Sequence, residues 1–377
     1  MTRARRGRGE GGVYQRPDGL WSAQLSLGYD GNGGRLRRTL YGQSKRDVQA
    51  KLRALQTDAD VGTLVAPERL TVSQFLSRWL DSAKQTIRAT TAARYRALIR
   101  VSVGPHIGGI PVQKLQPLQV QALYAKLEAA GLAPSTRRQV HAILHRAFAQ
   151  AVRWGNMVRN PCDAVDKPRV PKHRVDALKP EEVAKLAEAA SGDRLAALYV
   201  LALSTGMRQG ELLGLQWSDV DLPGRAVVVR HSLEEIAGKL RLSETKSGKV
   251  RRVDLDAHTV DALREHRKRM LAEGHPGPWV FPDTEGNPLR KSNLVRRSFK
   301  PLLKRAGLPD IRFHDLRHAA ATLMLLQGVN PKVVQERLGH AQLTITLDVY
   351  GHVLPTMQAD AVAKMDAFWR SAAVTTA

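Results

Sequence analysis

The chain has 377 residues, enough for two or three domains at about 150 residues each. Lys and Arg number 59 against 35 Asp and Glu, so the net charge is +24, while 43% of the residues are hydrophobic. This balance excludes a disordered basic polymer and indicates folded domains with a polyanionic partner. Cys162 is the only cysteine, which excludes intramolecular disulfides and cysteine-based metal clusters and fits a reducing compartment.

Two further classes are excluded by the distribution of apolar residues. The longest uncharged stretches, such as residues 195–207, are well short of the roughly 20 residues that cross a bilayer. The basic start of the chain is followed by no apolar core, so it is not a secretory signal. We therefore expect a soluble cytoplasmic protein without a membrane partner.

Residues 1–62 carry the pattern of a small sheet with one helix. Hydrophobic residues alternate with polar ones over residues 21–27, between the turn signals RPDG and YDGNGG, and a further strand is expected at RLRRTLY. Ser44 and Asp47 form a capping-box pattern, after which Val48, Leu52 and Leu55 recur at helical spacing. The prediction is a three-stranded sheet plus a helix.

The last of these strands is basic, with Arg35, Arg37 and Arg38. A β-ribbon of this kind can enter the major groove of DNA. The alternative is a solvated edge strand that uses positive charge to avoid aggregation. We favour contact with DNA.

Residues 66–165 change to a helical period. Behind a Thr71 cap, one helix face carries Val72, Phe75, Leu76, Trp79 and Leu80. Three more helices are expected near residues 91–102, 117–130 and 136–154, the last capped by Ser135. This predicts a compact helical domain.

Several arginines lie on the polar faces of these helices, and we take Arg94, Arg137 and Arg138 as candidate DNA contacts. Phosphate binding and plain solvation both suit such residues, so the pattern alone does not decide between them.

The segment 166–180 contains three prolines and little periodicity, which is typical of a linker. Beyond it, residues 175–377 are expected to form a mixed α+β domain that is mainly α, with a strand at 226–230 and a hairpin from about Lys239 to Leu255. The predicted fold class is therefore multidomain and predominantly α with small β elements.

Three segments of this last domain carry recognisable motifs: TGMRQGELLGLQW (205–217), HDLRH (314–318) and LGHAQLTITLDVYGH (338–352). In order, content and spacing they resemble the tyrosine recombinase, or phage integrase, family. The resemblance covers roughly residues 175–355. By order and layout, the first two domains are similar to the arm-binding and core-binding modules of integrases, so the resemblance implies the arm-binding type.

The resemblance also implies a catalytic set, carried over position by position. That set is Arg208, Lys246, His314, Arg317, His340 and Tyr350, with Glu211 and Asp315 in supporting places. Lys249 is close enough to compete with Lys246 for the hairpin lysine position. No cofactor and no metal are expected.

These residue types suit phosphodiester chemistry without the family name. Two guanidiniums, Arg208 and Arg317, can clamp the nonbridging oxygens on which negative charge grows during attack. A tyrosine hydroxyl, with a pKa near ~10, needs surrounding cations to become a nucleophile. A lysine can protonate the leaving oxygen, and His314 is the better candidate for the base that takes the tyrosine proton.

The implied function is site-specific recombination by an integrase of a phage or other mobile element, associated with the nucleoid of a bacterial host. The implied partners are double-stranded DNA, at core and arm sites, and further copies of the chain in a tetramer on DNA. Apolar residues near helical spacing at 355–370 predict an exchange helix that docks on a neighbouring copy, the alternative being that it folds back on its own domain. Whether DNA-bending or directionality factors are needed stays open, as do the target sequences.

Two other functions are compatible with parts of this sequence. A metal-dependent nuclease could use His314 and His318, four residues apart, with Asp315. It ranks low because further carboxylates are missing and the arginines would repel a cation. A regulator that binds DNA without cutting it would use the same charge but would form no covalent adduct.

Overall fold

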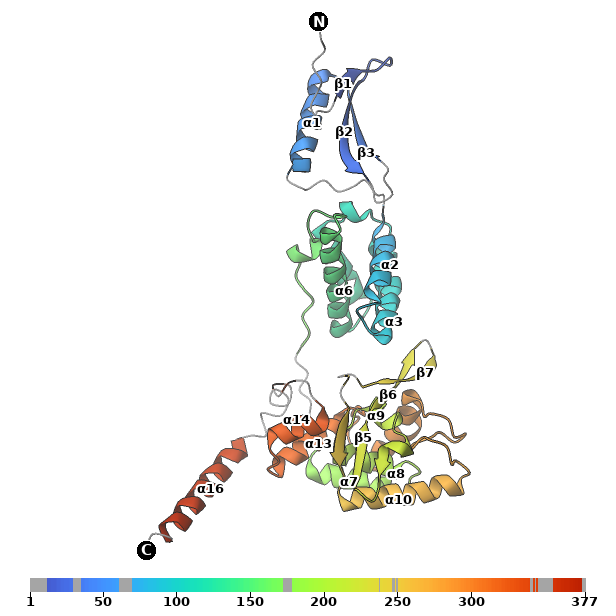
Figure 1. Ribbon diagram of the computed structural model, residues 1–377, viewed down its shortest axis with the longest axis vertical. Helices are drawn as coiled ribbons and strands as arrows, with labels where there is room; N and C mark the ends of the chain where they lie inside the picture. Colours follow the sequence, from blue (N-terminus) through green and yellow to red (C-terminus); the bar gives the residue numbers. More distant parts are fainter. Residues whose placement is uncertain are drawn as a thin grey trace. The chain divides into compact units, whose positions relative to one another are not determined.

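The computed structural model describes residues 12–29, 35–60, 70–171, 178–236, 238–245, 248, 250–339, 342, 344 and 355–374. The chain divides into two compact units, residues 1–172 and 173–377. In both units helices predominate and the sheets are small (Figure 1), which confirms the predicted fold class.

The N-terminal part of the first unit is a three-stranded antiparallel sheet with one helix. The strands are β1 (Gly12–Gln15), β2 (Trp21–Tyr29) and β3 (Arg35–Gly42), in the order β1-β2-β3, and the helix is α1 (Lys45–Asp60). The predicted apolar stripe of α1 is buried in one cluster with Ala23 and Leu25 of β2. The predicted sheet and helix are confirmed.

The start of α1 only partly matches the predicted capping box. The Asp47 backbone N–H donates to Ser44 Oγ at 3.1 Å, so Ser44 caps the helix as expected. The Asp47 carboxylate instead pairs with Lys51 Nζ at 2.9 Å, one turn further along the helix. A lysine four residues away offers that carboxylate a charged partner.

The helical part of the first unit has its own core. Its elements are α2 (Val72–Ala83), α3 (Ala89–Leu98), η1 (Ile99–Val103), α4 (Gly104–Ile107), η2 (Val112–Lys114), α5 (Pro117–Ala129), α6 (Pro134–Arg153) and η3 (Pro161–Ala164). All five predicted core residues of α2 are buried, and Thr71 forms a complete capping box with Gln74. The predicted Ser135 cap is wrong, because Pro134 is the first residue of α6 and its fixed φ starts the helix two residues earlier than expected, with Ala133 at the cap position.

Two helical runs contain a π turn that ends two positions before a proline. The turn at Ile99–Val103 is closed by a bond from the Gly104 N–H to Ile99 O, and the one at Leu294–Phe299 by a bond from the Lys300 N–H to Val295 O. Proline lacks an N–H and its ring collides with the carbonyl four residues earlier. The wider turn makes room for the ring, so that both chain segments remain helical through Pro105 and Pro301.

The first residues of the expected linker are attached to the helical part. The Asp166 N–H donates to Gln121 Oε1 at 3.1 Å, Arg138 Nη1 donates to Pro168 O at 3.3 Å, and Pro168 is buried. The middle of the predicted linker, residues 172–177, lies outside the described residues. The division into domains 1–62, 66–165 and 175–377 stays a prediction.

The second unit is mainly helical around two small sheets. Its helices are α7 (Pro180–Ala190), α8 (Ala196–Thr205), α9 (Gln209–Leu213), η4 (Trp217–Asp219), α10 (Ala257–Ala272), α11 (Lys291–Asn293), η5 (Leu294–Phe299), α12 (Lys300–Arg305), α13 (Asp315–Leu326), α14 (Pro331–Leu338) and α16 (Pro355–Val374). Its strands are β4 (Val220–Asp221), β5 (Ala226–Val229), β6 (His231–Ile236), β7 (Lys239–Glu244) and β8 (Arg251–Asp254).

The predicted hairpin from Lys239 to Leu255 is wrong in its pairing. β7 pairs with the preceding strand β6 through a turn at Gly238, whose φ is +79°, and β8 pairs with β5 to complete the sheet β4-β5-β8. The cross-strand pair Leu233–Leu242 and a tight turn beside it favour the local hairpin.

The last helix, α16, exposes its apolar residues. Every described side chain from 361 to 370 is exposed, including Val362, Met365, Phe368 and Trp369. Among the helices that are described, none is long and apolar enough to span a bilayer.

Candidate active site

Arg208 lies between α8 and α9, and the residues on either side of it in the chain fix its position. α8 ends at Gly206, whose left-handed φ of +63° turns the chain, and Arg208 then caps the start of α9. Glu211, one turn later, accepts from the Arg208 N–H at 2.9 Å and from Arg208 Nη1 at 2.9 Å. This contact orients the guanidinium and suits the supporting role expected for Glu211, which stays a prediction.

Arg317, on the first turn of α13, is buried and bonds to the turn that precedes Arg208. Its Nη1 donates to Gly206 O at 2.7 Å and its Nη2 to Leu338 O at 2.8 Å. Arg208 Nη2 donates to Gly339 O at 3.1 Å. The two arginines therefore meet at consecutive carbonyl groups at the end of α14, although 109 positions separate them in the chain.

The end of α14 is suited to bind cations. Gly339 has a φ of +69° and ends the helix, so the last carbonyl groups of α14 lack partners within the helix and lie at the negative end of its dipole. His340 follows directly in the chain. The structure thus brings Arg208, Glu211 and Arg317 together at the residue that precedes the predicted His340.

A third arginine, Arg251, was not predicted. It donates from Nη1 and Nη2 to the two carboxylate oxygens of Glu211, at 3.2 and 2.6 Å. Burial disfavours the charged form of Glu211, but the hydrogen bonds and charges of Arg251 and Arg208 outweigh it, so the Glu211 pKa lies below its ordinary value. Neither the burial of Glu211 nor the approach of Arg251 from a distant strand carries a signal in the sequence.

His314 begins α13 beside the arginines. Partial burial, the neighbouring His318 and the charge of Arg317 lower the pKa of His314 to about 4, so its ring is neutral at pH 7. The rings of His314 and His318 meet edge to face, 5.2 Å apart.

The Asp315 carboxylate is occupied by Arg312, whose backbone N–H and guanidinium both donate to it, at 2.8 Å each. Burial opposes ionisation of Asp315, yet Arg312 holds its pKa below the ordinary value. Among the described residues, no group of three or more His, Cys, Asp or Glu side chains could hold a metal ion. The position of Asp315 suits its predicted supporting role, which remains a prediction.

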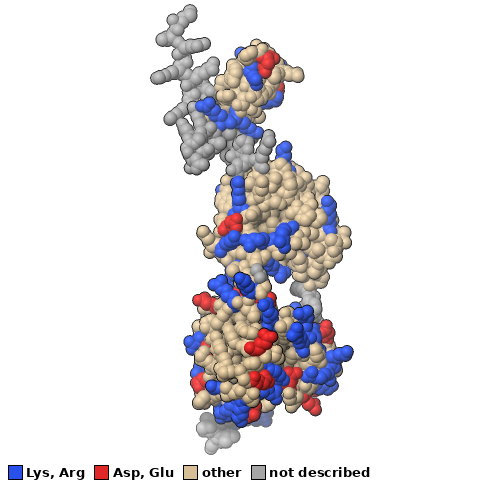
Figure 2. Space-filling model, turned by 90° about the vertical axis from the view of Figure 1, so that its right-hand side faces the viewer, with Lys and Arg blue, Asp and Glu red and all other residues tan. Residues whose placement is uncertain are grey.

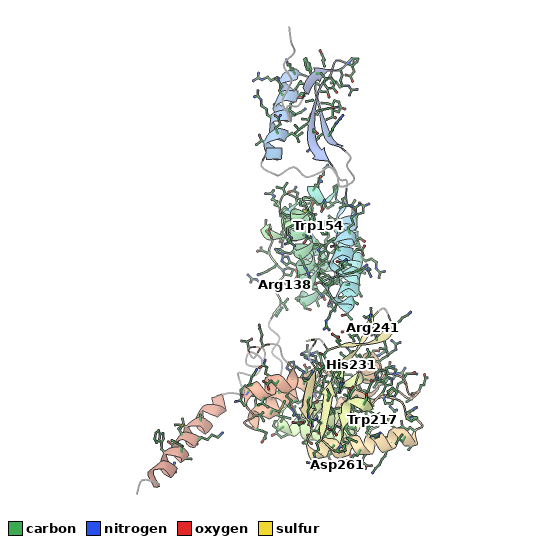
Figure 3. All side chains as sticks on the ribbon, viewed as in Figure 1. Arg138, Trp154, Trp217, His231, Arg241 and Asp261 are labelled. Atoms are coloured by element: carbon green, nitrogen blue, oxygen red, sulfur yellow. The ribbon has the colours of Figure 1, made fainter. Side chains whose placement is uncertain are left out.

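Four of the residues assigned or weighed from the sequence, Lys246, Lys249, His340 and Tyr350, lie outside the described residues. The strands that flank the two lysines are described. β7, with Arg241, and β6, with His231 at its start, form the hairpin labelled in Figure 3, and β8 begins at Arg251.

The candidate DNA contacts of β3 lie on two faces of the sheet. Arg37 is opposite Ser26 and Arg38 is opposite the buried Leu25, so the side chains of these neighbouring arginines leave opposite faces. Both are exposed, and of Arg35 only the strand position is described. Arg37 and Arg38 therefore cannot both contact DNA from one face of the sheet, and the assignment of these arginines as DNA contacts stays a prediction.

Arg94, Arg137 and Arg138 belong to the helical part. Arg94 is exposed and donates to Gln139, Arg137 is largely buried in an ion pair with Glu128 at 2.7 Å, and Arg138 holds the chain at Pro168. Figure 3 labels Arg138 near the start of α6 and Trp154 at its end. In Figure 2 the visible face of the helical part bears Lys and Arg with little acidic residue between them, whereas the second unit mixes both signs.

Comparison with known proteins agrees with this arrangement. Residues 176–357 match the model of the phage integrase family, and residues 71–127 match that of the phage integrase N-terminal SAM-like domain. An integrase of Streptomyces ambofaciens is 30% identical, with 98% of this chain and 99% of that protein covered. The chain belongs to the phage integrase family.

Other family members extend the comparison. A XerC-like tyrosine recombinase of Caldanaerobacter subterraneus is 29% identical over 90% of this chain and 93% of its own length. The Tn1549 transposon integrase, solved with circular intermediate DNA, superposes with a TM-score of 0.68 at 22% identity, covering 79% of this chain and 99% of that one. A lambda integrase tetramer bound to a Holliday junction gives a TM-score of 0.59 at 21% identity over 92% and 97%. This integrase is thus a tyrosine recombinase, an enzyme that breaks and rejoins DNA at specific sites.

Proposed function

We propose that this integrase recombines two specific DNA sites by sequential strand exchange, with Tyr350 as the nucleophile and a 3′-phosphotyrosyl intermediate. Tyr350 Oη bonds to phosphorus, the bond to the 5′ oxygen breaks, and the departing oxygen takes a proton. A second 5′-hydroxyl then reverses these steps on the new strand. The ester conserves the bond energy, so exchange needs neither ATP nor a metal ion.

The convergence of Arg208 and Arg317 on the end of α14 carries this proposal. Both guanidiniums are fixed by backbone carbonyl groups, and Arg208 also by Glu211, so little reorganisation is needed when a phosphate arrives. Preorganised donors of this kind stabilise the charge that develops on the nonbridging oxygens. Arg208 keeps a quarter of its side chain exposed, which leaves it accessible to DNA.

The proton transfers are assigned to the remaining residues. His314 is the proposed base, and its lowered pKa supports the role, because only a neutral imidazole can accept the tyrosine proton. Lys246 is the proposed acid for the 5′ oxygen, with Lys249 as the rival, and His340 is proposed to donate a hydrogen bond to the phosphate.

The test is covalent capture of DNA on a suicide substrate. Wild type should form an adduct, equally with EDTA present, whereas Tyr350→Phe should bind the same half-site and form none. Tyr199→Phe is the matched control, since it removes a hydroxyl that hydrogen-bonds to Ser298 Oγ in the core of the same unit. Adducts in the Tyr350→Phe variant, or an absolute Mg²⁺ requirement, would overturn the proposal in favour of another nucleophile or of the nuclease.

We further propose that residues 1–62 bind arm sites and that residues 66–165 and 175–377 bind the core site. The enzyme is proposed to act as a tetramer on the nucleoid, in the cytoplasm. The sheet face opposite α1 supports the first role, because it carries the exposed Tyr14 and Tyr41, with Arg16 stacked 5.2 Å from the Tyr41 ring centroid. Deletion of residues 1–62 should abolish arm-site binding while core-site cleavage persists. Unchanged binding to both site classes would contradict this.

The exposed apolar side chains of α16 support the proposed exchange helix. Truncation after Leu354 should leave half-site binding nearly intact and reduce the yield of Holliday junctions, because the docking contact between copies is lost. If the truncated chain loses cooperative melting and half-site binding, α16 belongs to its own core and the exchange model fails.

A further inference from the structure

Arg251 is a buried, fully engaged arginine of the second unit that has no role in the proposed reaction. It opens β8, opposite Val229 of β5, and only 10% of its side chain is exposed. Its Nη1 and Nη2 make a two-pronged contact with the Glu211 carboxylate, at 3.2 and 2.6 Å, and its Nε donates to Arg337 O at 3.1 Å. The planar guanidinium fork matches a carboxylate in this way, and a lysine cannot reproduce it.

The charge balance around Glu211 requires this second cation. The Glu211 side chain is completely buried, and its two oxygens accept from Arg208 as well as from Arg251. With Arg208 alone, the buried carboxylate would lose one of its two charged partners, so Glu211 would be protonated more easily and Arg208 would lose the anion that orients it. With Arg251, the three side chains keep one net positive charge, which remains on the exposed side, at Arg208.

Arg251 also contacts the other group that holds Arg208. A Cβ on Gly339 would lie 3.2 Å from Cδ, Nε and Cζ of Arg251, so the guanidinium packs directly against that glycine. The Gly339 carbonyl accepts from Arg208 Nη2, and the Arg337 carbonyl accepts from Arg251. One side chain on β8 therefore touches both the carboxylate and the helix end that fix Arg208.

We propose that Arg251 is a positioning residue for cleavage, which holds Glu211 ionised and the end of α14 in place so that Arg208 meets the scissile phosphate. The proposal rests on the phosphate-binding role proposed above for Arg208. This positioning role differs from a purely structural one, because loss of Arg251 leaves a buried carboxylate whose protonation then controls the rate of cleavage. Burial raises the Glu211 pKa, and the hydrogen bond from Arg251 is the strongest influence that opposes it.

The experiment compares Arg251→Met with Arg252→Met, its neighbour on the same strand. Arg252 points to the exposed face, with 54% of its side chain exposed and partners Asp221 and Asp254, so it controls for the loss of one arginine. The rate of adduct formation on a suicide half-site is measured from pH 6 to 9, together with half-site affinity and thermal melting. Arg251→Met should bind DNA normally and cleave ~10-fold more slowly at pH 7, less than the ~10²-fold expected for loss of a direct donor.

The pH profile decides between positioning and structure. The deficit of Arg251→Met should grow as pH falls, because its Glu211 becomes protonated, and it should shrink toward pH 9. In Glu211→Gln/Arg251→Met, which has no carboxylate to titrate, the deficit should be the same at every pH. Arg251→Lys keeps the charge without the two-pronged contact, so it should show a smaller rate deficit with the same direction of pH dependence. If Arg251→Met does not fold, the pH profile of Arg251→Lys tests the positioning role instead.

Three results would overturn the inference: an Arg251→Met rate equal to that of Arg252→Met, a deficit independent of pH, or a wild-type profile for Arg251→Lys when the methionine variant is unfolded. These differ from failure of the proposed function. If wild type itself forms no adduct, the proposed function fails, whereas a normal wild-type adduct with any of these three results removes only the role of Arg251.

Discussion

Replacement of Gly206 by alanine should damage both the stability of the second unit and its cleavage chemistry. Gly206 has a φ of +63°, and an alanine in this left-handed region costs about 1 kcal/mol. Its Cβ would also collide with Leu338 Cδ2 and lie 3.5 Å from Ala320 Cβ. Overpacking of this kind costs ~1–3 kcal/mol, so we expect the free energy of unfolding to fall by about 2–4 kcal/mol in total.

The effect on cleavage follows from the carbonyl of the same residue. Relief of the collision moves Gly206 or Leu338, and the carbonyl groups of both residues accept from Arg317, at 2.7 and 2.8 Å. Small displacements of catalytic groups can slow a reaction by as much as ~10²-fold, so we expect Gly206→Ala to slow adduct formation by ~10-fold or more.

Gly307→Ala is the matched control, because Gly307 has a φ of +64° and no atom within 4 Å of its added Cβ. It should lose only about 1 kcal/mol and cleave normally. Leu338→Val removes the atom with which the new Cβ collides, so Gly206→Ala/Leu338→Val should be less destabilised than the sum of its two single variants by ~1 kcal/mol or more. Calorimetric melting and single-turnover cleavage measure these effects. If Gly206→Ala is no less stable than Gly307→Ala, the packing argument is refuted.

Three further predictions concern the proposed chemistry. Arg208→Ala and Arg317→Ala should each slow cleavage by ~10²-fold with little loss of half-site affinity, and a large loss of affinity with unchanged cleavage of bound DNA would contradict their role. The pKa of His314 is 6.5 in the unfolded chain and about 4 in the folded chain, so the free energy of unfolding should fall as pH falls through this window. His314→Gln should flatten that fall. An unchanged slope in a pH series of melts would disprove this. A 5′-thiolate leaving group, which needs no proton, should rescue Lys246→Ala, and rescue of Lys249→Ala instead would transfer the acid role to that lysine.

The sequence by itself determined the elements and the chemistry of this integrase. Hydrophobic periodicity located the three-stranded sheet with its helix, the helices of the helical part and strand β5. It could do so because a buried stripe at helical or strand spacing is a local property of the sequence. The motifs proposed Arg208, Glu211, His314 and Arg317 through their resemblance to the family, and phosphodiester chemistry can use the two arginines and the histidine, so their catalytic roles stay proposals.

Only the tertiary structure decided which groups meet. Arg251 reaches Glu211 from 40 positions away, and the arginine pair is fixed by carbonyl groups of α14 that no side-chain pattern reveals. The pairing of β7 with β6 likewise depends on which strands lie side by side in the folded chain. A sequence pattern shows which face of an element is buried, but the identity of the contacting group depends on how distant segments pack, and that is set by the balance of the whole core.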